Sequence, residues 1–176
     1  VMVTNAPTPE TLVFLKSGKI DFGVVSTPFS GEGVHSETVR EIEDIFVAGR
    51  QFFQYKNKTL DLHDLENLPL ITLEKNTSTR SCMDSFLAEN GVRINPEFEL
   101  ATSDMIGQFA LRSLCIGNVE RDFAAEYLES GRLFELRFNK MIPRRHFCVV
   151  TGKGNLLSAA ARRLLELIQT EEYRKE

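Results

Sequence analysis

A hydroxyl-rich segment, Thr72–Asp84 (TLEKNTSTRSCMD), contains the residues of this chain best suited to bind a ligand. It follows the apolar run Leu68–Leu73, which predicts a short buried strand, and it opens a segment with apolar residues at helical spacing. A helix N-terminus offers free backbone N–H groups and the positive end of the helix dipole, and the hydroxyls of Thr77 and Ser78 add further donors. This pattern predicts a site for a small anion.

The same hydroxyls also have a simpler explanation. Ser and Thr are preferred N-cap residues, because the side-chain oxygen accepts a hydrogen bond from a backbone N–H of the first helical turn. Thr77 or Ser78 would then cap the helix that ends at Asn90-Gly91. Capping and ligand binding are compatible, and both interpretations remain open at this point.

Composition restricts the class of protein. A chain of 176 residues can bury a core, in one domain or in two small lobes, and 42% apolar with 26% charged residues is ordinary for a soluble globular protein. The formal net charge is −4, and no basic block exceeds Arg144-Arg145 with the nearby Lys140. No DNA-binding face is therefore predicted, and any contact with nucleic acid would need another segment.

The cysteines and the apolar runs indicate a cellular setting. Cys82, Cys115 and Cys148 are widely spaced, and an odd number without a C-x-x-C motif indicates reduced thiols and a cytoplasmic location. There is no signal peptide, and no apolar run approaches the ~18 residues of a membrane span. The chain begins inside an apparent strand, Val1–Thr4, which suggests a fragment of a longer protein.

Nothing in the sequence indicates a metal centre or a cofactor. The three histidines, His35, His63 and His146, lack the spacing of metal ligands, so we expect neither a metal site nor a bound cofactor.

Strand and helix patterns alternate along almost the whole chain, which predicts an α/β fold with parallel sheets. Helices are expected after Thr8, at Ser81–Glu89, after Thr102, at Arg121–Glu129 and after Ser158. Strands are expected at Lys19–Val25, Ile45–Tyr55, Leu68–Leu73, Glu97–Thr102, Leu114–Val119, Leu133–Phe138 and His146–Val150. Ser26–Glu37, rich in Gly, Ser, Thr and Pro, is expected to be a loop.

This order of elements resembles the effector-binding domain of LysR-type transcriptional regulators from about Thr4 to Ile168. The similarity rests on FLKSGKIDFGVV, LDLHDLENLPLITLEKNTSTR, ATSDMIGQFALRSLCIGNVERDFA and RRHFCVVTGKGNLLSAAARRLLELI. No single segment is specific, but their order and spacing together are.

The resemblance implies a two-lobe fold like that of type-2 periplasmic binding proteins. Each lobe would be a mostly parallel sheet flanked by helices, and two crossing strands would join the lobes. Lobe I would comprise residues 1–44 and 139–176, and lobe II residues 45–138. The effector would lie in the cleft between them, at the carboxyl ends of strands.

The chain departs from the family pattern in two places. The winged helix-turn-helix and the first strand and helix of the effector domain are absent, so DNA contact would come only from a domain outside this chain, and lobe I would have unpaired strand edges. Many members also read Gly-Leu-Gly-Ile where this chain has Ser113-Leu114-Cys115-Ile116. In this chain the next residue, Gly117, is the only glycine left of that glycine-rich strand.

The resemblance also implies effector contacts. The candidates lie where predicted strands lead into helices, or at the end of a lobe I strand: Thr77, Ser78, Thr102, Ser26, Thr27 and Asn5. Thr8 and Ser103 are interpreted as helix caps.

These residues supply hydroxyls and amides rather than fixed positive charge. Arg80 and Arg144 are expected to be solvated at the surface, so helix N-termini would hold the effector, which we expect to be an anionic metabolite. Peroxide-sensing members have a cysteine at the position of Ser78. Here the nearest thiol, Cys82, lies one turn later without an evident resolving partner, so redox sensing is the minor alternative.

The predicted function is that of a regulatory sensor that forms a homodimer or homotetramer and catalyses no reaction. An effector bridging the lobes would shift their closure equilibrium and change oligomer geometry. Two alternatives are a solute-binding protein of a transport system and a dehydratase-type enzyme. The cleft loops offer Thr, Ser and Asn without a carboxylate–histidine pair, which disfavours the enzyme.

Overall fold

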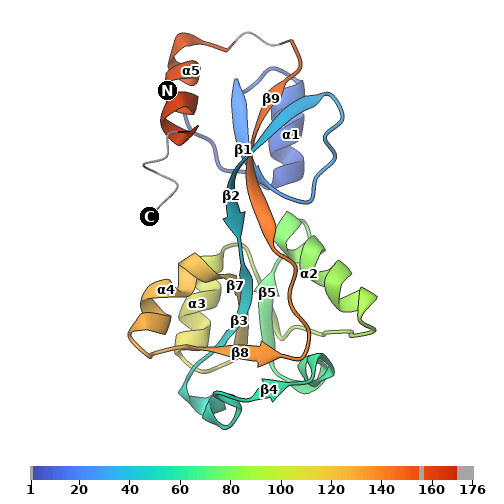
Figure 1. Cartoon of the computed structure of the whole chain (residues 1–176), viewed down its shortest axis with the longest axis vertical. Coiled ribbons are helices and arrows are strands. Elements are labelled where there is room, and N and C mark those ends of the chain that lie inside the picture. The colour runs from blue at the N-terminus through green and yellow to red at the C-terminus, as the bar shows by residue number, and fades with distance from the viewer. Residues whose placement is uncertain (1, 155–156, 170–176) are drawn as a thin grey trace. The chain divides into compact units, whose positions relative to one another are not determined.

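A computed structural model describes residues 2–154 and 157–169 of the chain. The chain divides into two compact units (Figure 1). Unit 1 comprises Val1–Glu41 and Arg145–Glu176, and unit 2 comprises the intervening residues, Ile42–Arg144. Unit 2 is therefore inserted between the two halves of unit 1.

The described residues of unit 1 form a three-stranded sheet with two helices. Its elements are α1 (Thr8–Lys16), β1 (Phe22–Ser26), β2 (Val34–Ile42, which ends at the start of unit 2), β9 (Arg145–Gly152) and α5 (Ala159–Gln169). The strand order is β1-β9-β2. Leu12 and Leu15 of α1 form one buried cluster with Val25, Cys148 and Val150, whereas Val24, the neighbour of Val25, is half exposed. This alternation follows from the two-residue period of a strand.

Two segments of unit 1 differ from expectation. Met2–Thr4 form no strand in the structure, and the side chains of Met2 and Val3 are 90% and 86% exposed. The strand expected at the start of the chain is therefore not formed by these described residues. Conversely, the segment expected to be a loop up to Glu37 includes the start of β2, whose exposed and mostly polar residues hide the strand pattern.

Unit 2 is a six-stranded sheet with helices on both faces. Its strands are β3 (Asp44–Ala48), β4 (Thr59–Leu60), β5 (Leu70–Leu73), β6 (Phe98–Leu100), β7 (Ile116–Glu120) and β8 (Phe134–Phe138), in the order β4-β8-β3-β7-β5-β6. Its helices are α2 (Ser78–Glu89), α3 (Ser103–Leu111) and α4 (Arg121–Glu129), with the 3₁₀ turns η1 (Arg50–Tyr55) and η2 (Leu62–Asn67).

The alternation of buried residues assigns these helices to the two faces of the sheet. Phe46 and Ala48 of β3 belong to the cluster that contains Met83, Phe86 and Leu87 of α2. The β3 residues between them, Ile45 and Val47, belong to the cluster that contains Ile106 and Ala110 of α3 and Ala124 of α4. In Figure 1, α2 accordingly lies on one side of the sheet and α3 with α4 on the other.

The strand directions follow the prediction in most of unit 2. Parallel pairs join β5 to β6 and to β7, and β4 to β8. β3 pairs antiparallel with both β7 and β8, and in unit 1 β1 pairs antiparallel with β9. The strand–helix–strand segments from β5 to β7 impose a parallel direction on these strands, because a helix returns the chain to the starting edge.

Gly117 of β7 permits the close approach of α3. A Cβ at this position would lie 2.7 Å from Ile106 Cγ2 and 3.5 Å from Ala110 Cβ. Ile106 and Ala110 are fully buried, so a side chain at position 117 could be accommodated only if α3 moved away from β7. The one glycine that the chain shares with the family's glycine-rich strand therefore has a packing role.

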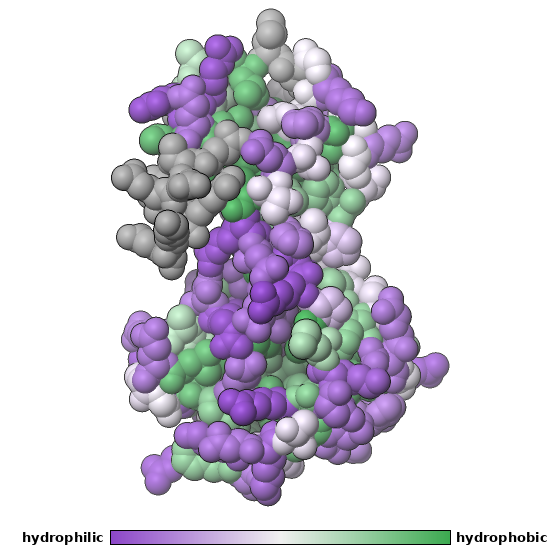
Figure 2. Space-filling model, in the orientation of Figure 1, coloured by the Kyte–Doolittle hydropathy of each residue, from purple (hydrophilic) through white to green (hydrophobic). Residues whose placement is uncertain are grey.

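Hydrophilic residues cover much of the face of unit 2 that is visible in Figure 2, with smaller hydrophobic areas between them. Among the described residues, no helix has the length and apolar character needed to span a membrane.

Replacing Gly117 with Ala should destabilise unit 2 by about 1–3 kcal/mol, the usual cost of overpacking a filled core. Denaturant unfolding followed by circular dichroism measures the change. Gly31→Ala is the matched control, because no atom lies within 4 Å of its added Cβ, and its effect should stay within about 0.5 kcal/mol. Equal stabilities of Gly117→Ala and the unmodified chain would contradict the packing role.

Candidate functional site

Two neighbouring parallel strands of unit 2 end side by side and lead directly into helices. Leu73 of β5 is paired with Leu100 of β6, and the Glu74 N–H donates to the Leu100 carbonyl oxygen at 3.0 Å. The turn after β5 leads into α2, and the turn after β6 leads into α3. The carboxyl edge of the sheet thus brings together the turns that contain Thr77, Ser78 and Thr102, as the candidate site requires.

Thr77 is the N-cap of α2. Its hydroxyl oxygen accepts the Arg80 N–H at 3.2 Å, and the same hydroxyl donates to the Glu74 carbonyl oxygen at 2.9 Å. The capping interpretation is correct for this residue, and its hydroxyl hydrogen is already used. Thr77 would therefore order the turn to which a ligand binds, and its hydroxyl would not donate a hydrogen bond to that ligand.

Ser78 and Thr102 lie at the starts of α2 and α3. Ser78 is the first residue of α2 and is partly exposed, so its backbone N–H belongs to the first turn of the helix. Thr102 is exposed and is the N-cap of α3, and its side chain makes no capping hydrogen bond. Ser103 was expected to be this cap, but it is the first helical residue instead.

Arg80 corrects the sequence prediction most clearly. It was expected at the surface, but it is only 3% exposed. Its Nη1 donates to Thr72 Oγ1 (2.7 Å), to the Leu73 carbonyl oxygen (2.9 Å) and to Glu99 Oε1 (2.9 Å). Its Nε donates to Asp84 Oδ1 at 2.7 Å.

The electrostatics of this network keep the arginine charged. Burial lowers the pKa of Arg80, but the hydrogen bonds and negative charges of Asp84 and Glu99 more than offset that effect, so the pKa is raised overall. The positive charge beneath the two turns is therefore permanent and is neutralised locally by carboxylates. Sequence reasoning missed this role, although an acid four residues after Arg80 is a helical ion-pair spacing.

The three candidates in unit 1 lie near the ends of α1 and β1. Asn5 is exposed in the segment before α1, whose N-cap is Pro7, so Thr8 is the first helical residue and not the expected cap. Ser26 is buried at the end of β1. Thr27 is tied to β9, since its hydroxyl oxygen accepts the His146 N–H at 2.9 Å and its N–H donates to the His146 carbonyl oxygen at 2.9 Å.

Comparison with known proteins decides the family. Residues 1–172 match the LysR substrate binding domain. This chain belongs to that family. The family resemblance that the sequence motifs indicated is confirmed.

Relatives of this LysR substrate binding domain are transcriptional regulators. The HTH-type transcriptional activator CmpR of Synechocystis is 27% identical over 124 residues, which cover 70% of this chain and 41% of CmpR. The RuBisCO operon transcriptional regulator of Allochromatium vinosum is 24% identical over 173 residues, covering 98% of this chain and 56% of the relative. The chain spans about half the length of these relatives.

Solved structures confirm the predicted two-lobe fold class. The regulatory domain of CcmR from Synechocystis PCC6803, in complex with 2-PG, matches with a TM-score of 0.83 at 16% identity, covering 97% of this chain and 81% of CcmR. The effector binding domain of QuiR in complex with shikimate matches with a TM-score of 0.80 at 16% identity, covering 97% of this chain and 79% of QuiR.

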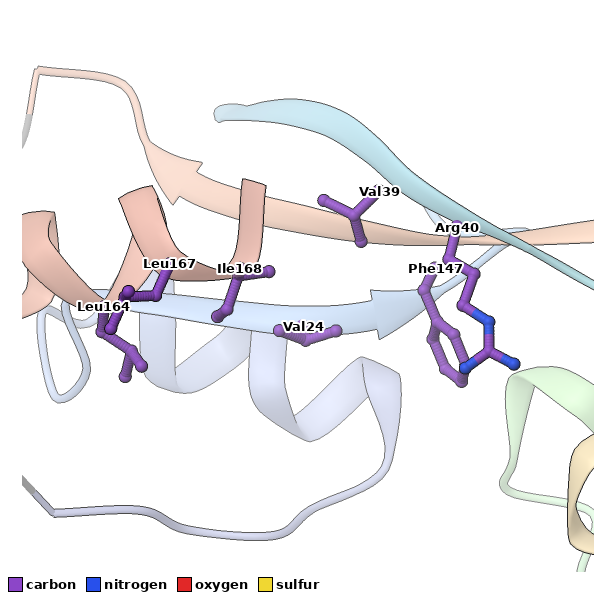
Figure 3. Close-up of a pocket in the computed structure, with 7 residues that line it drawn as sticks. All are labelled: Val24, Val39, Arg40, Phe147, Leu164, Leu167 and Ile168. Carbon is purple, nitrogen blue, oxygen red and sulfur yellow. The ribbon is translucent and has the colours of Figure 1, made fainter. Parts of the chain in front are cut away.

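A groove that sequence reasoning did not predict lies in unit 1 of this LysR domain (Figure 3). Its volume is about 370 Å³, and it is lined by Val24, Val39, Arg40, Phe147, Leu164, Leu167 and Ile168. Leucine and isoleucine side chains of α5 line one end, and Arg40 and Phe147 lie toward the other. The groove contains none of the candidate effector residues, and apolar side chains dominate its lining.

Two of the sequence predictions concern metal-ligating side chains and thiols. Cys82, the thiol of the redox alternative, is partly exposed, and that alternative stays a prediction. Residues 2–154 and 157–169 contain no group of three or more His, Cys, Asp or Glu side chains placed to hold a metal ion. Cys115 and Cys148 are buried, and burial raises the pKa of the Cys115 thiol, with a smaller contribution from the charge of Glu97. A thiol with a raised pKa is a poor nucleophile.

Thr77→Ala should destabilise unit 2 by about 1 kcal/mol, because the first turn of α2 loses its cap. Thr77→Ser is the matched control, since it retains the hydroxyl that caps the helix, and its stability should stay close to that of the unmodified chain. Urea unfolding of the three proteins measures the difference. Loss of the same stability in both variants would show that the methyl group, and not the cap, is what matters.

Proposed function

We propose that this LysR domain senses a small anionic metabolite, carrying a carboxylate or a phosphate, at the turns that open α2 and α3. The observation that carries the proposal is the parallel pairing of β5 with β6, which brings two helix N-termini to one edge of the sheet. Backbone N–H groups at such ends favour negative charge.

The proposed contacts are Ser78 and Thr102, with Thr77 as the cap that orders the first turn of α2. α2 has no acidic residue in its first turn, so no carboxylate there competes with an anion. Asp104 lies in the first turn of α3, which makes α2 the stronger anion-binding end. The unit 1 candidates Asn5, Ser26 and Thr27 remain predicted contacts.

The similar proteins support an anionic effector class. The CcmR regulatory domain has been solved with 2-PG and the QuiR domain with shikimate, and the relatives include regulators of RuBisCO genes. We extend from these proteins only the chemistry that both ligands share, a small anion with several oxygen atoms.

The whole protein is proposed to regulate transcription in the cytoplasm. DNA binding would come from a domain outside this chain, and the regulator would act as a homodimer or homotetramer. Effector binding would change the relative populations of two oligomer arrangements on DNA. This requires that the effector bind one arrangement more tightly than the other. We propose no catalytic activity for the domain, in line with relatives that are transcriptional regulators.

Titration calorimetry with 2-phosphoglycolate, shikimate and inorganic phosphate tests the site. At least one of these should bind the unmodified chain, and Ser78→Asp should weaken it at least about tenfold, because like charges repel strongly at close range. Ser85→Asp is the matched control: the same charge is added at an exposed position of α2, two turns further along. Its affinity should remain unchanged.

Two results would contradict the proposal. Equal binding to Ser78→Asp and to the unmodified chain would place the site elsewhere. No binding of any of the three anions to a chain that unfolds cooperatively would exclude the proposed effector class at these turns.

A further inference from the structure

The two turns proposed to bind the effector are separated in the chain by α2 and β6, yet one buried side chain contacts the strands that lead into both. We propose that Arg80 is the positioning residue that holds the β5–α2 turn and the β6–α3 turn in the geometry that binds the effector. This inference rests on the proposed effector site and adds to it a residue that acts from beneath the turns.

Arg80 first closes the β5–α2 turn on itself. At the start of the turn, Nη1 donates to the carbonyl oxygen of Leu73 and to the hydroxyl of Thr72. At its end, the Arg80 N–H donates to Thr77 Oγ1. The same residue therefore holds both ends of the turn, and Ser78 lies within the closed segment.

Arg80 also connects this turn to the neighbouring one. Its Nη1 lies 2.9 Å from Glu99 Oε1, and Glu99 is on β6, three residues before Thr102. The Arg80–Glu99 ion pair thus reinforces the backbone hydrogen bond from Glu74 to Leu100 at the same edge. A shift of one turn relative to the other would break both contacts.

Asp84 fixes the guanidinium in this orientation. It lies one helical turn after Arg80 and accepts from Nε at 2.7 Å, with its own side chain 43% exposed. The Arg80 side chain is 4% exposed, so the network holds a desolvated cation between two carboxylates that retain contact with water. The guanidinium donates from two separate atoms of a rigid plane, Nε toward Asp84 and Nη1 toward β5 and β6, whereas an ammonium group donates from a single atom.

Burial of an ion pair is a costly route to stability, because desolvation cancels much of the attraction and a well-packed apolar side chain often stabilises as well. Directional hydrogen bonds to two strands and one helix instead specify a unique geometry. Helix N–H donors bind an anion well only when they are ordered before it arrives, since ordering on binding reduces affinity.

The test uses Arg80→Lys, which keeps the positive charge and removes the planar guanidinium with its Nε and Nη1 donors. Affinity for 2-phosphoglycolate, measured by calorimetry, should fall about tenfold if the competent geometry is populated about one tenth of the time. Hydrogen exchange followed by mass spectrometry should show faster exchange in residues 70–84 and 97–106, with the rest of unit 2 unchanged. Arg132→Lys is the control, because Arg132 pairs with Glu126 at an exposed site of the same unit.

Glu99→Ala provides a second variant that leaves the contacts of Arg80 within its own turn intact. It should accelerate exchange mainly in residues 97–106 and weaken binding less than Arg80→Lys. If Arg80→Lys does not fold, Glu99→Ala tests the positioning role alone. We expect this variant to fold, because Glu99 lies on a short edge strand and its side chain is partly exposed.

The two proposals fail in different ways. If no anion binds the unmodified chain, the proposed effector fails, and the exchange measurement still decides whether Arg80 orders both turns. Unchanged exchange in both turns of a folded Arg80→Lys would falsify the positioning role. A uniform rise of the exchange rate across unit 2, with affinity lost only in proportion to the unfolded fraction, would also overturn the positioning role. Arg80 would then be a general stabilising residue.

Discussion

The structure of unit 2 depends on one constraint, the need to bury both faces of its central sheet. Alternate residues of β3 enter two different apolar clusters, one with α2 and the other with α3 and α4. A sheet with two buried faces requires helices on both, and strand–helix–strand connections that alternate between the faces supply them. The same requirement explains why Gly117 lies under α3, where a side chain would separate helix from strand. The candidate site follows from this packing, because parallel strands covered in this way end at a common edge.

The proposed site is ordered by the buried charge of Arg80, which lies beneath the two turns, and not by a charged side chain among the proposed contacts. Arg80 is buried among β5, α2 and β6, and its partners Asp84 and Glu99 leave the network with no excess positive charge. In the proposed site, the attraction for an anion would come from the ends of helices, whose partial charges are built from the backbone. Such a site would select small ligands by the positions of N–H and hydroxyl groups. Unit 1 differs: its groove is lined mainly by apolar side chains, with Arg40 near one end, and is not of this kind.

Much of the fold and part of the site were predictable from local patterns. Residue spacing predicted a helix at Ser81–Glu89 with a hydroxyl cap and a strand at Leu68–Leu73, and the structure has them at Ser78–Glu89 and Leu70–Leu73. The family came from the resemblance of the ordered motifs to LysR effector-binding domains, which the match over residues 1–172 confirms. The errors have physical causes. β2 was missed because its residues are mostly polar and exposed, which removes the alternation that marks a strand. Met2–Thr4 read as a strand from composition, but a strand needs a neighbour with which to exchange hydrogen bonds, and none pairs with it in the described structure.

The sequence by itself determined most of the helices, the alternation of strands and helices from β5 to α4, and the polar turn at Thr77–Ser78, because these depend on residues close together in the chain. Only the tertiary structure decided that Arg80 is buried and that Glu99, 19 residues away, is its partner. It also decided that the turns before Ser78 and Ser103 meet at one edge. An arginine within a polar segment looks solvated in any local window. Its burial depends on acceptors from two other strands, and only strand pairing brings these within hydrogen-bonding distance.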